Sequence, residues 1–157
     1  MPAEENIILP EKIITPDRII FLDCASKREA LLALVENISA AGEVKDPAEL
    51  STEILKREEL MSTAIGLGIA IPHVRLASVT DLVVSAGISR KDILDFQTLD
   101  DEPVRIILMI AAAYDQHAYY LQTLSFFSAR LKNAKMRTAL LNAKSSREVY
   151  TLLTGKS

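Results

Sequence analysis

Residues 66–73 read Gly-Leu-Gly-Ile-Ala-Ile-Pro-His, and no other stretch of the 157-residue chain constrains its fold as strongly. Gly66 and Gly68 let the backbone turn tightly and approach another group closely. The Ile-Ala-Ile triplet that follows is typical of a short buried strand. Pro72 disfavours helical geometry in the residue before it and has no N–H for a sheet ladder. We therefore expect a short strand that ends at Pro72 and holds His73 at its end on stiff backbone.

Three other segments have the composition of strands. Residues 18–22 form a short β-branched and aromatic run, and residues 82–88 and 104–112 are apolar runs of strand length. The last run is continuously apolar instead of alternating. That pattern is expected of a strand covered on both faces, so residues 104–112 are predicted to form such a strand.

Helical patterns lie between these strands. Ser26 and Glu29 form a capping-box pattern at the start of a helix that we expect Gly42 to close. Asp46 is the expected N-cap of a second helix over residues 47–59, with a proline in its first turn. Both helices precede the glycine-rich stretch around residue 66.

A third helix is expected after the long apolar strand, with Asp115 as its cap. Helical spacing predicts an inner face made of Leu121, Leu124, Phe127 and Leu131. Two short helices, over residues 136–141 and 149–153, complete the chain. Ser145 with Glu148 gives the last of them a second capping-box pattern.

Helical and strand patterns alternate along the chain without an internal repeat or a linker. Such alternation is typical of an α/β fold. We therefore predict a single-domain α/β sandwich over residues 1–157, with a mixed β-sheet flanked by helices on both faces. Residues 1–16 are expected to form an N-terminal extension packed on this domain.

The composition excludes several classes of protein. The 18 basic and 21 acidic residues are mixed along the chain and give a net charge of −3, with no basic stripe for nucleic acid. The longest apolar run, residues 106–113, is far too short to span a membrane. The N-terminus is acidic where a secretion signal would be basic. We expect a cytoplasmic protein without nucleic-acid binding or direct membrane insertion.

Side chains that bind metals are scarce. Cys24 is the only cysteine, and His73 and His117 are the only histidines. Neither an internal disulfide nor a thiolate or multi-histidine metal centre can be built from them. We therefore expect no metal.

His73 is the side chain best suited to chemistry. Neutral imidazole is a nucleophile near pH 7, and no nearby serine or cysteine is an obvious nucleophilic partner. If His73 accepts a phosphoryl group, cations must hold the new charge, and Arg57 and Arg75 are the candidates nearby in sequence. Arg75 lies two residues after His73 and shares its face on an extended chain. A purely structural histidine after a tight turn is the alternative that these residues leave open.

His117 falls in the first turn of the helix expected after residue 115. Its spacing from Leu121 and Leu124 predicts that it points toward the body of the domain. Free backbone N–H groups at a helix N-terminus favour anions there. A second histidine in that place would orient or hydrogen-bond the first.

Several of these motifs together resemble a known family. Arg57-Glu58, followed by Thr63-x-x-Gly66-x-Gly68-Ile-Ala-Ile-Pro-His73, is similar to the signature of the phosphotransferase-system EIIA domains of the fructose/mannitol type. The nitrogen-regulatory EIIA proteins share that signature. Asp95-Phe96, Asp100/Asp101-Glu-Pro-Val104 and the closing Ser-Ser-Arg-Glu-Val-Tyr-x-Leu-Leu helix also match the usual pattern. The resemblance therefore covers nearly the whole chain.

The resemblance implies a phosphotransferase component in which His73 receives a phosphoryl group from an HPr-like phosphocarrier. Arg57 matches an arginine that would hold the phosphoryl oxygens during transfer. Thr63 matches a threonine of the site loop, where it would hydrogen-bond locally. The family's second histidine lies at the start of the helix after the long strand, which points to His117. The partner on the other side would be an EIIB domain or a regulatory target protein, and no metal or organic cofactor is implied.

Two departures from the family pattern stand out. The family favours a small residue after the Pro-His pair, and here Val74 follows, which would narrow the approach of a donor or alter the turn. Many members have His-Leu-x-x-Leu at the second histidine. Anchored on Leu121 and Leu124, that position is Tyr120, whereas anchored on the preceding strand it is His117. Both residues stay candidates for the second ring of the site.

Three functions are compatible with the resemblance. We favour a nitrogen-branch-type regulatory EIIA, in which phosphorylation of His73 decides the binding partner, because the single-domain layout and the helical end resemble those proteins. The alternative is a sugar-transport EIIA that passes the phosphoryl group to an EIIB domain. A further alternative is a non-catalytic interaction module with a vestigial site. The joint presence of Arg57, Thr63, both glycines and His73 argues against that last function.

Overall fold

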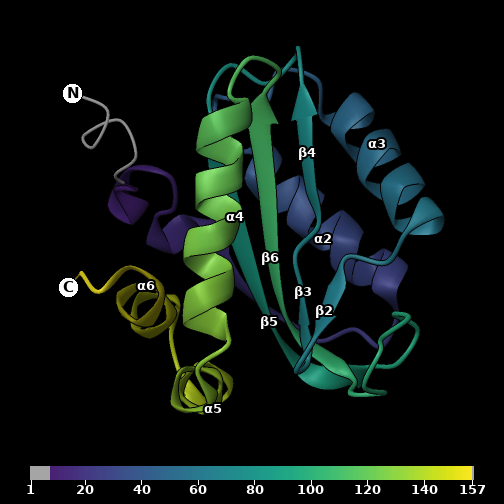
Figure 1. Cartoon of the computed structure of the whole chain (residues 1–157), viewed down its shortest axis with the longest axis vertical. Helices are drawn as coiled ribbons and strands as arrows, with labels where there is room; N and C mark the ends of the chain where they lie inside the picture. Colours follow the sequence, from purple (N-terminus) through teal and green to yellow (C-terminus); the bar gives the residue numbers. More distant parts are fainter. Residues whose placement is uncertain (1–7, 157) are drawn as a thin grey trace.

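The computed structural model describes residues 8–156, and within them the chain alternates between strands and helices (Figure 1). In chain order the elements are the 3₁₀ helices η1 (Pro10–Lys12) and η2 (Pro16–Arg18), β1 (Ile19–Leu22), α2 (Lys27–Ser39), α3 (Pro47–Leu60), β2 (Ala64–Gly66), β3 (Ile69–Ala70), β4 (His73–Leu76), β5 (Val83–Ile93), β6 (Val104–Ala113), α4 (His117–Leu131), α5 (Ala134–Asn142) and α6 (Ser146–Thr154). The predicted α/β class is confirmed.

The strands of the described chain form one mixed sheet in the order β1-β5-β6-β3-β2, with β4 also paired to β6. The β5–β6 and β2–β3 pairs are antiparallel, and the pairs of β6 with β3 and β4 and of β5 with β1 are parallel. β6 therefore lies in the centre of the sheet, between β5 on one side and β3 and β4 on the other.

Each face of the sheet packs against its own layer of helices, as predicted. Ile106, Leu108 and Ile110 of β6 belong to the core cluster shared with α4, α5 and α6. The intervening Ile107 and Met109 belong to the cluster shared with α2 and α3. Figure 1 shows α4 in front of the sheet and α2 behind it. Side chains of one strand thus alternate between two cores.

The strand that carries His73 does not end at Pro72, which corrects the sequence prediction. β3 and β4 both run beside β6 in one continuous register, with Ala70 opposite Ile107 and His73 opposite Ile110. Pro72 has no N–H, but its carbonyl oxygen accepts the Ile110 N–H at 2.9 Å, so the ladder continues past it. His73 is therefore the first residue of a strand and not the residue after one.

Three of the predicted helix caps are confirmed, and two are wrong. The side chains of Ser26, Asp46 and Ser145 each accept the backbone N–H three residues later. Gly42 does not close α2, because the helix already ends at Ala40, which keeps right-handed geometry. The N-cap of α4 is Gln116 and not Asp115. Gln116 is held in place because its side chain accepts the Ala113 N–H and donates to Asp81.

The inner face of α4 is confirmed in its second half and differs in its first. Phe127 and Leu131 are buried as predicted, and Leu124 is partly buried against the core. Tyr120 and Thr123 are also buried, whereas Leu121 is 49% exposed and His117 is exposed. The prediction that His117 points toward the body of the domain is therefore wrong.

The described part of the N-terminal extension packs on the domain. Ile13 and Ile14 are buried in the core cluster that contains α6, and the Ile13 carbonyl oxygen accepts the Val84 N–H at 2.9 Å. The rest of the predicted extension, residues 1–7, lies outside the described residues. No helix within residues 8–156 is both long enough and apolar enough to cross a membrane.

Candidate functional site

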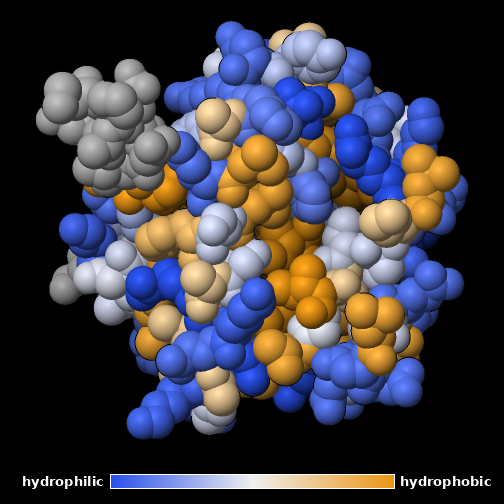
Figure 2. All heavy atoms as spheres, in the orientation of Figure 1, coloured by the Kyte–Doolittle hydropathy of each residue, from blue (hydrophilic) through white to orange (hydrophobic). Residues whose placement is uncertain are grey.

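A pocket of about 330 Å³ opens between the C-terminal end of α3, the β2–β3 hairpin and α4. It brings together Arg57, Thr63 and His73, three residues that the sequence analysis singled out. Its other polar lining residues are Ser62 and Ser128. Figure 2 shows hydrophobic side chains gathered in the middle of this face, around the hollow. The polar side chains of the pocket are thus surrounded by largely apolar side chains.

His73 is half-buried in this pocket, and its ring is held by a backbone carbonyl. Nδ1 lies 2.5 Å from the Ile71 carbonyl oxygen. A carbonyl oxygen only accepts, so Nδ1 must carry the hydrogen of this bond. The neutral ring then keeps its lone pair on Nε2. Nε2 is therefore the ring nitrogen with a free lone pair.

Of the two candidates for a second ring, Tyr120 is the one that lies beside His73. The ring centroids of His73 and Tyr120 are 5.5 Å apart, and Tyr120 is buried. Burial raises the pKa of the Tyr120 hydroxyl, and the positive charges of Arg57 and Arg75 oppose that shift only in part. The phenol consequently stays neutral near pH 7 and keeps its hydrogen for donation.

Arg75 lies on the same side of β4 as His73, as the two-residue spacing predicts. Its guanidinium is 5.8 Å from the centre of the Tyr120 ring and 5.6 Å from that of Tyr114. It also donates a hydrogen bond of 2.9 Å to the Tyr114 carbonyl oxygen. Arg75 therefore lies near the Tyr120 ring, and neither of these two residues is among those that line the pocket.

Val74 does not narrow the pocket, contrary to expectation. Its side chain is fully buried in the core cluster shared with α2 and α3, and in the sheet it lies opposite Ala111. His73 points to the other face of the sheet, where Tyr120 lies. Because neighbouring residues of a strand face opposite ways, a branched residue at this position leaves the approach to His73 unchanged.

The glycines fold the β2–β3 turn into a conformation that other residues adopt with strain. Gly66, Leu67 and Gly68 all have positive φ values, of 86°, 61° and 78°. A Cβ on Gly68 would lie 3.1 Å from the Pro103 carbonyl oxygen. Glycine is needed here for both conformation and space. The turn sets the position of β3, and β3 leads directly to His73.

Asp100 fastens this turn to the loop between β5 and β6. Its carboxylate accepts the Leu67 N–H at 2.8 Å and the Glu102 N–H at 3.1 Å. These bonds, that from Leu67 above all, lower the pKa of Asp100 from its usual value near 3.8. A carboxylate with a lowered pKa stabilises the fold above its unfolded-state pKa, and this contribution is lost as the pH falls through the folded-state pKa.

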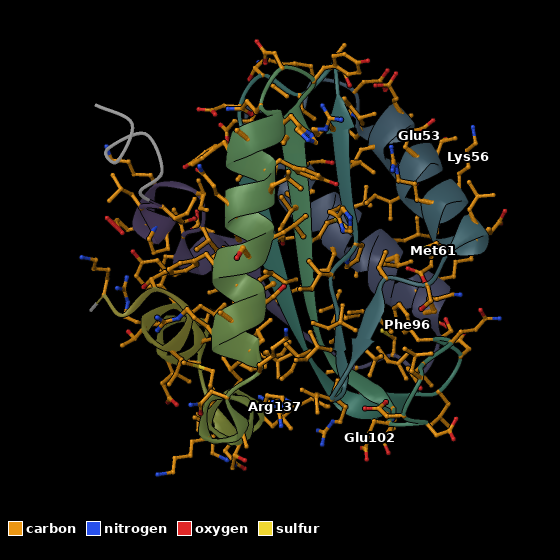
Figure 3. The ribbon with its side chains drawn as sticks, viewed as in Figure 1. Glu53, Lys56, Met61, Phe96, Glu102 and Arg137 are labelled. Atoms are coloured by element: carbon orange, nitrogen blue, oxygen red, sulfur yellow. The ribbon has the colours of Figure 1, made fainter. Side chains whose placement is uncertain are left out.

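Asp100→Ala is therefore expected to lower the free energy of unfolding at pH 7. The difference from wild type should shrink below about pH 4, where the wild-type carboxyl becomes protonated. Urea unfolding followed across this pH range measures the effect. Glu102→Ala, at an exposed position of the same loop, is the matched control (Figure 3). A difference that stays constant with pH would contradict the assigned role of the Asp100 charge.

The sequence analysis assigned no role to Glu58. This residue is only 5% exposed, and it accepts hydrogen bonds from both the backbone N–H and the hydroxyl of Thr63. The signal that could have revealed it is periodicity. Leu50, Ile54 and Glu58 are spaced by four residues and form the buried stripe of α3, so a carboxylate stands at an inner position.

The sequence analysis also did not predict a group of exposed apolar side chains near the pocket, called the apolar rim below. Leu60 and Met61 are 77% and 78% exposed at the end of α3, and Ile65, Leu67 and Leu121 are exposed as well. Met61 lies where the chain passes from α3 toward β2 (Figure 3). Exposed apolar side chains gathered on one face mark a contact surface for another protein.

Comparisons with known proteins agree on one family. Residues 12–156 match the family described as phosphoenolpyruvate-dependent sugar phosphotransferase system, EIIA 2. A nitrogen regulatory protein of Escherichia coli (strain K12) is 34% identical over 132 residues, which cover 83% of this chain and 80% of that protein. The fructose-specific EIIABC component of Bacillus subtilis (strain 168) is 33% identical over 132 residues, or 84% of this chain. The match spans only 21% of that Bacillus protein.

A solved structure has the same fold. It is the complex of enzyme IIA for mannitol with phosphorylated enzyme IIB for mannitol, from Escherichia coli. The likeness has a TM-score of 0.77 at 25% sequence identity and covers 91% of this chain and 98% of the matched chain. The arrangement of strands and helices around the pocket is therefore shared with a protein solved together with a phosphorylated partner.

Proposed function

The chain belongs to the EIIA 2 family of the phosphoenolpyruvate-dependent sugar phosphotransferase system, and we propose that it carries a phosphoryl group on Nε2 of His73. The observation that carries this proposal is the state of the His73 ring. Nδ1 donates to the Ile71 carbonyl oxygen, and the ring shares a pocket with the Arg57 guanidinium. A nucleophile and a cation thus lie at one site, which is what phosphoryl transfer needs.

The transfer step is a displacement at phosphorus. The Nε2 lone pair of His73 attacks the phosphorus of a phosphohistidine on the donor, and the donor's P–N bond breaks with its electrons returning to the donor ring. The positive charge that develops on the His73 ring is stabilised by the Ile71 carbonyl oxygen at Nδ1. Arg57 attracts the oxygens of the moving phosphoryl group, and its planar fork suits them.

Tyr120 takes the place of the family's second histidine beside His73. Its neutral hydroxyl supplies a hydrogen-bond donor without changing charge near pH 7, because burial raises its pKa. A histidine there would titrate in the physiological range. The site of this chain is therefore less dependent on pH than one with two histidines.

Tyr120→His should make transfer more sensitive to pH. Between about pH 6 and 8, the rate of the variant is expected to depend on one more ionising group than the wild-type rate. The added group is the new histidine, because histidine normally titrates near pH 6.5. Initial rates of His73 phosphorylation across this range measure the difference. Tyr120→Phe, which keeps the ring and removes the hydroxyl, is the control. Identical pH profiles for wild type and Tyr120→His would contradict the placement of this ring in the site.

The partners are proteins. We propose that an HPr-like phosphocarrier donates the phosphoryl group and that its surface contacts the apolar rim formed by Leu60, Met61, Ile65, Leu67 and Leu121. Leu60, Met61 and Ile65 of this rim line the pocket that holds His73, so a partner seated there would exclude water from the reacting atoms. Thr63, with both of its donors bonded to Glu58, supports the site loop.

Downstream, we propose a nitrogen-branch-type regulatory role, in which the phosphorylation state of His73 selects the target protein. The match over 80% of the Escherichia coli nitrogen regulatory protein supports this role. The alternative, transfer to an EIIB domain during sugar uptake, is supported by the likeness to enzyme IIA in its complex with phosphorylated enzyme IIB. We also propose that residues 1–157 form one domain and that the protein is cytoplasmic.

One reconstitution tests donor and acceptor together. The protein is incubated with phosphoenolpyruvate, Enzyme I and an HPr-like donor from either the sugar branch or the nitrogen branch. We expect a single acid-labile, base-stable phosphate, formed faster with the nitrogen-branch donor. Faster transfer from the sugar-branch HPr, followed by discharge to an EIIB domain, would favour the alternative role. No phosphate from either donor would contradict the proposed function.

A further inference from the structure

Glu58 is a buried carboxylate that forms no ion pair among the described residues, although Lys27 and Arg28 line a pocket together with it. The rest of the last turn of α3 is exposed, and Lys56 extends away from the sheet (Figure 3). The ion pairs of the described chain join Lys91 to Asp23 and Arg105 to Asp92, and none includes Glu58. A carboxylate taken out of water costs free energy unless hydrogen bonds compensate it. The compensation here comes entirely from the site loop.

That compensation comes from a single residue. Both Glu58 carboxylate oxygens lie 3.2 Å from the Thr63 backbone nitrogen, and the Thr63 hydroxyl donates to Oε1 at 2.5 Å. Hydrogen bonds to an ionised acceptor are stronger than neutral ones. Glu58 therefore fixes the loop that leads from α3 to β2. Because both Thr63 donors are used, Thr63 has none left for a phosphoryl group.

The chain of bonds continues from Thr63 to the reactive ring. The Thr63 carbonyl oxygen accepts the Ile71 N–H at 3.0 Å, and the Ile71 carbonyl oxygen accepts the hydrogen of His73 Nδ1. Ile71 is 2% exposed, so these links are shielded from water. A shielded hydrogen bond holds geometry more firmly than one that competes with solvent.

We propose that Glu58 is a positioning residue for His73, acting through the hydrogen bonds of Thr63 and Ile71. This inference rests on the proposed function, because it concerns the same histidine. Glu58 does not touch the phosphoryl group. It sets the position of Ile71, and the Ile71 carbonyl oxygen in turn sets both the ring orientation and the tautomer that leaves Nε2 unprotonated. Small displacements of a reacting group are costly in rate.

Glu58→Gln tests this role with almost no change in shape. An amide accepts at one oxygen only, and both Thr63 donors can reach an oxygen at the Oε1 position. The NH₂ group then stands 3.2 Å from the Thr63 backbone nitrogen in place of Oε2, so the bond to Oε2 is lost and the remaining acceptor carries no charge. We expect the kcat for phosphorylation of His73 to fall roughly tenfold to a hundredfold, while the KM for the HPr-like donor stays within about twofold. Glu59→Gln, the same change at the exposed neighbouring position, is the matched control and should keep the wild-type rate.

The His73 tautomer gives a second readout that needs no phosphoryl transfer. In ¹⁵N NMR of the unphosphorylated protein, we expect wild type and Glu59→Gln to hold the Nδ1–H form, and Glu58→Gln to mix both tautomers. Thr63→Val, which removes only the hydroxyl, should shift kcat and tautomer in the same direction, and Thr63→Ser should largely restore them. If Glu58→Gln does not fold, Thr63→Val and Thr63→Ser test the proposal in its place.

A purely structural role would look different. Glu58→Gln and Thr63→Val would then lower the melting temperature while kcat per folded molecule and the tautomer stayed at wild-type values, and the proposal would be overturned. Failure of the proposed function is distinguishable, because wild type itself would then take up no phosphate. The tautomer comparison among the variants would still test the hydrogen-bonded chain.

Discussion

His73→Ala is expected to take up no phosphoryl group from any donor of the phosphotransferase system. The substitution removes Nε2, the one imidazole lone pair in the pocket. Arg57 stays, but a cation without a nucleophile cannot form the P–N bond. Intact-protein mass spectrometry after incubation with phosphoenolpyruvate, Enzyme I and the HPr-like donor measures the effect, which should be complete loss of the phosphorylated species.

The second histidine of the chain provides the matched control for this experiment. His117 is exposed on the first turn of α4 and is not among the pocket-lining residues. His117→Ala should therefore be phosphorylated at the wild-type rate. A phosphorylated His73→Ala protein, or a His117→Ala protein that takes up none, would move the reactive residue away from the β3–β4 junction.

Arg57→Ala should slow transfer by about a hundredfold to a thousandfold, the range found when one preorganised charge-stabilising donor is removed from an active site. Arg57 is exposed on α3 and lines the pocket, so its main role is to attract the phosphoryl oxygens. Its removal should change the melting temperature little, because substitutions at exposed positions without buried partners have small effects on stability.

Stopped-flow or quenched-flow rates of His73 phosphorylation, measured alongside thermal unfolding, check the Arg57 prediction. Lys56→Ala removes an equal charge from the neighbouring position on the outer side of α3 and should keep the wild-type rate. Arg57→Lys should recover part of the rate, since it keeps the charge and loses the planar fork. A large loss of stability with an unchanged rate would assign Arg57 to the fold and not to the chemistry.

Local signals in the sequence were reliable where short-range physics decides the outcome. Ser26, Asp46 and Ser145 cap helices as predicted, because a cap depends on a side chain and an N–H only three residues apart. The continuous apolar run of β6 predicted a strand covered on both faces, and its side chains do alternate between the two core clusters.

Errors arose where long-range packing decides the outcome. Pro72 was expected to end a strand, but its carbonyl oxygen still accepts a hydrogen bond from the Ile110 N–H. The sequence does not show which strand will pair with this segment. In the first turns of α4, Tyr120 and Thr123 are buried where Leu121 was expected, although Phe127 and Leu131 are buried as predicted. The sequence left both Tyr120 and His117 as candidates for the second ring, and packing places Tyr120 beside His73.

The role of Glu58 was not predicted, for a different reason. Charged residues near a helix end are usually solvated, and Glu58 stands between the charged Arg57 and Glu59, so its type and its neighbours alone indicate an exposed position. Its inward position follows from the spacing to Leu50 and Ile54. Its partner Thr63 is bonded through a loop whose path depends on the turn at Gly66 and Gly68, which spacing alone does not predict.

The central claim is that a backbone carbonyl holds the hydrogen of His73 on Nδ1 and so leaves Nε2 to attack phosphorus. The most direct measurement is ³¹P and long-range ¹H–¹⁵N NMR of the ¹⁵N-labelled protein after phosphorylation by the HPr-like donor. We predict that phosphorus is bonded to Nε2 of His73 and that the unphosphorylated ring carries its hydrogen on Nδ1. Phosphorus on Nδ1 or on another residue, or a hydrogen on Nε2 before transfer, would contradict it.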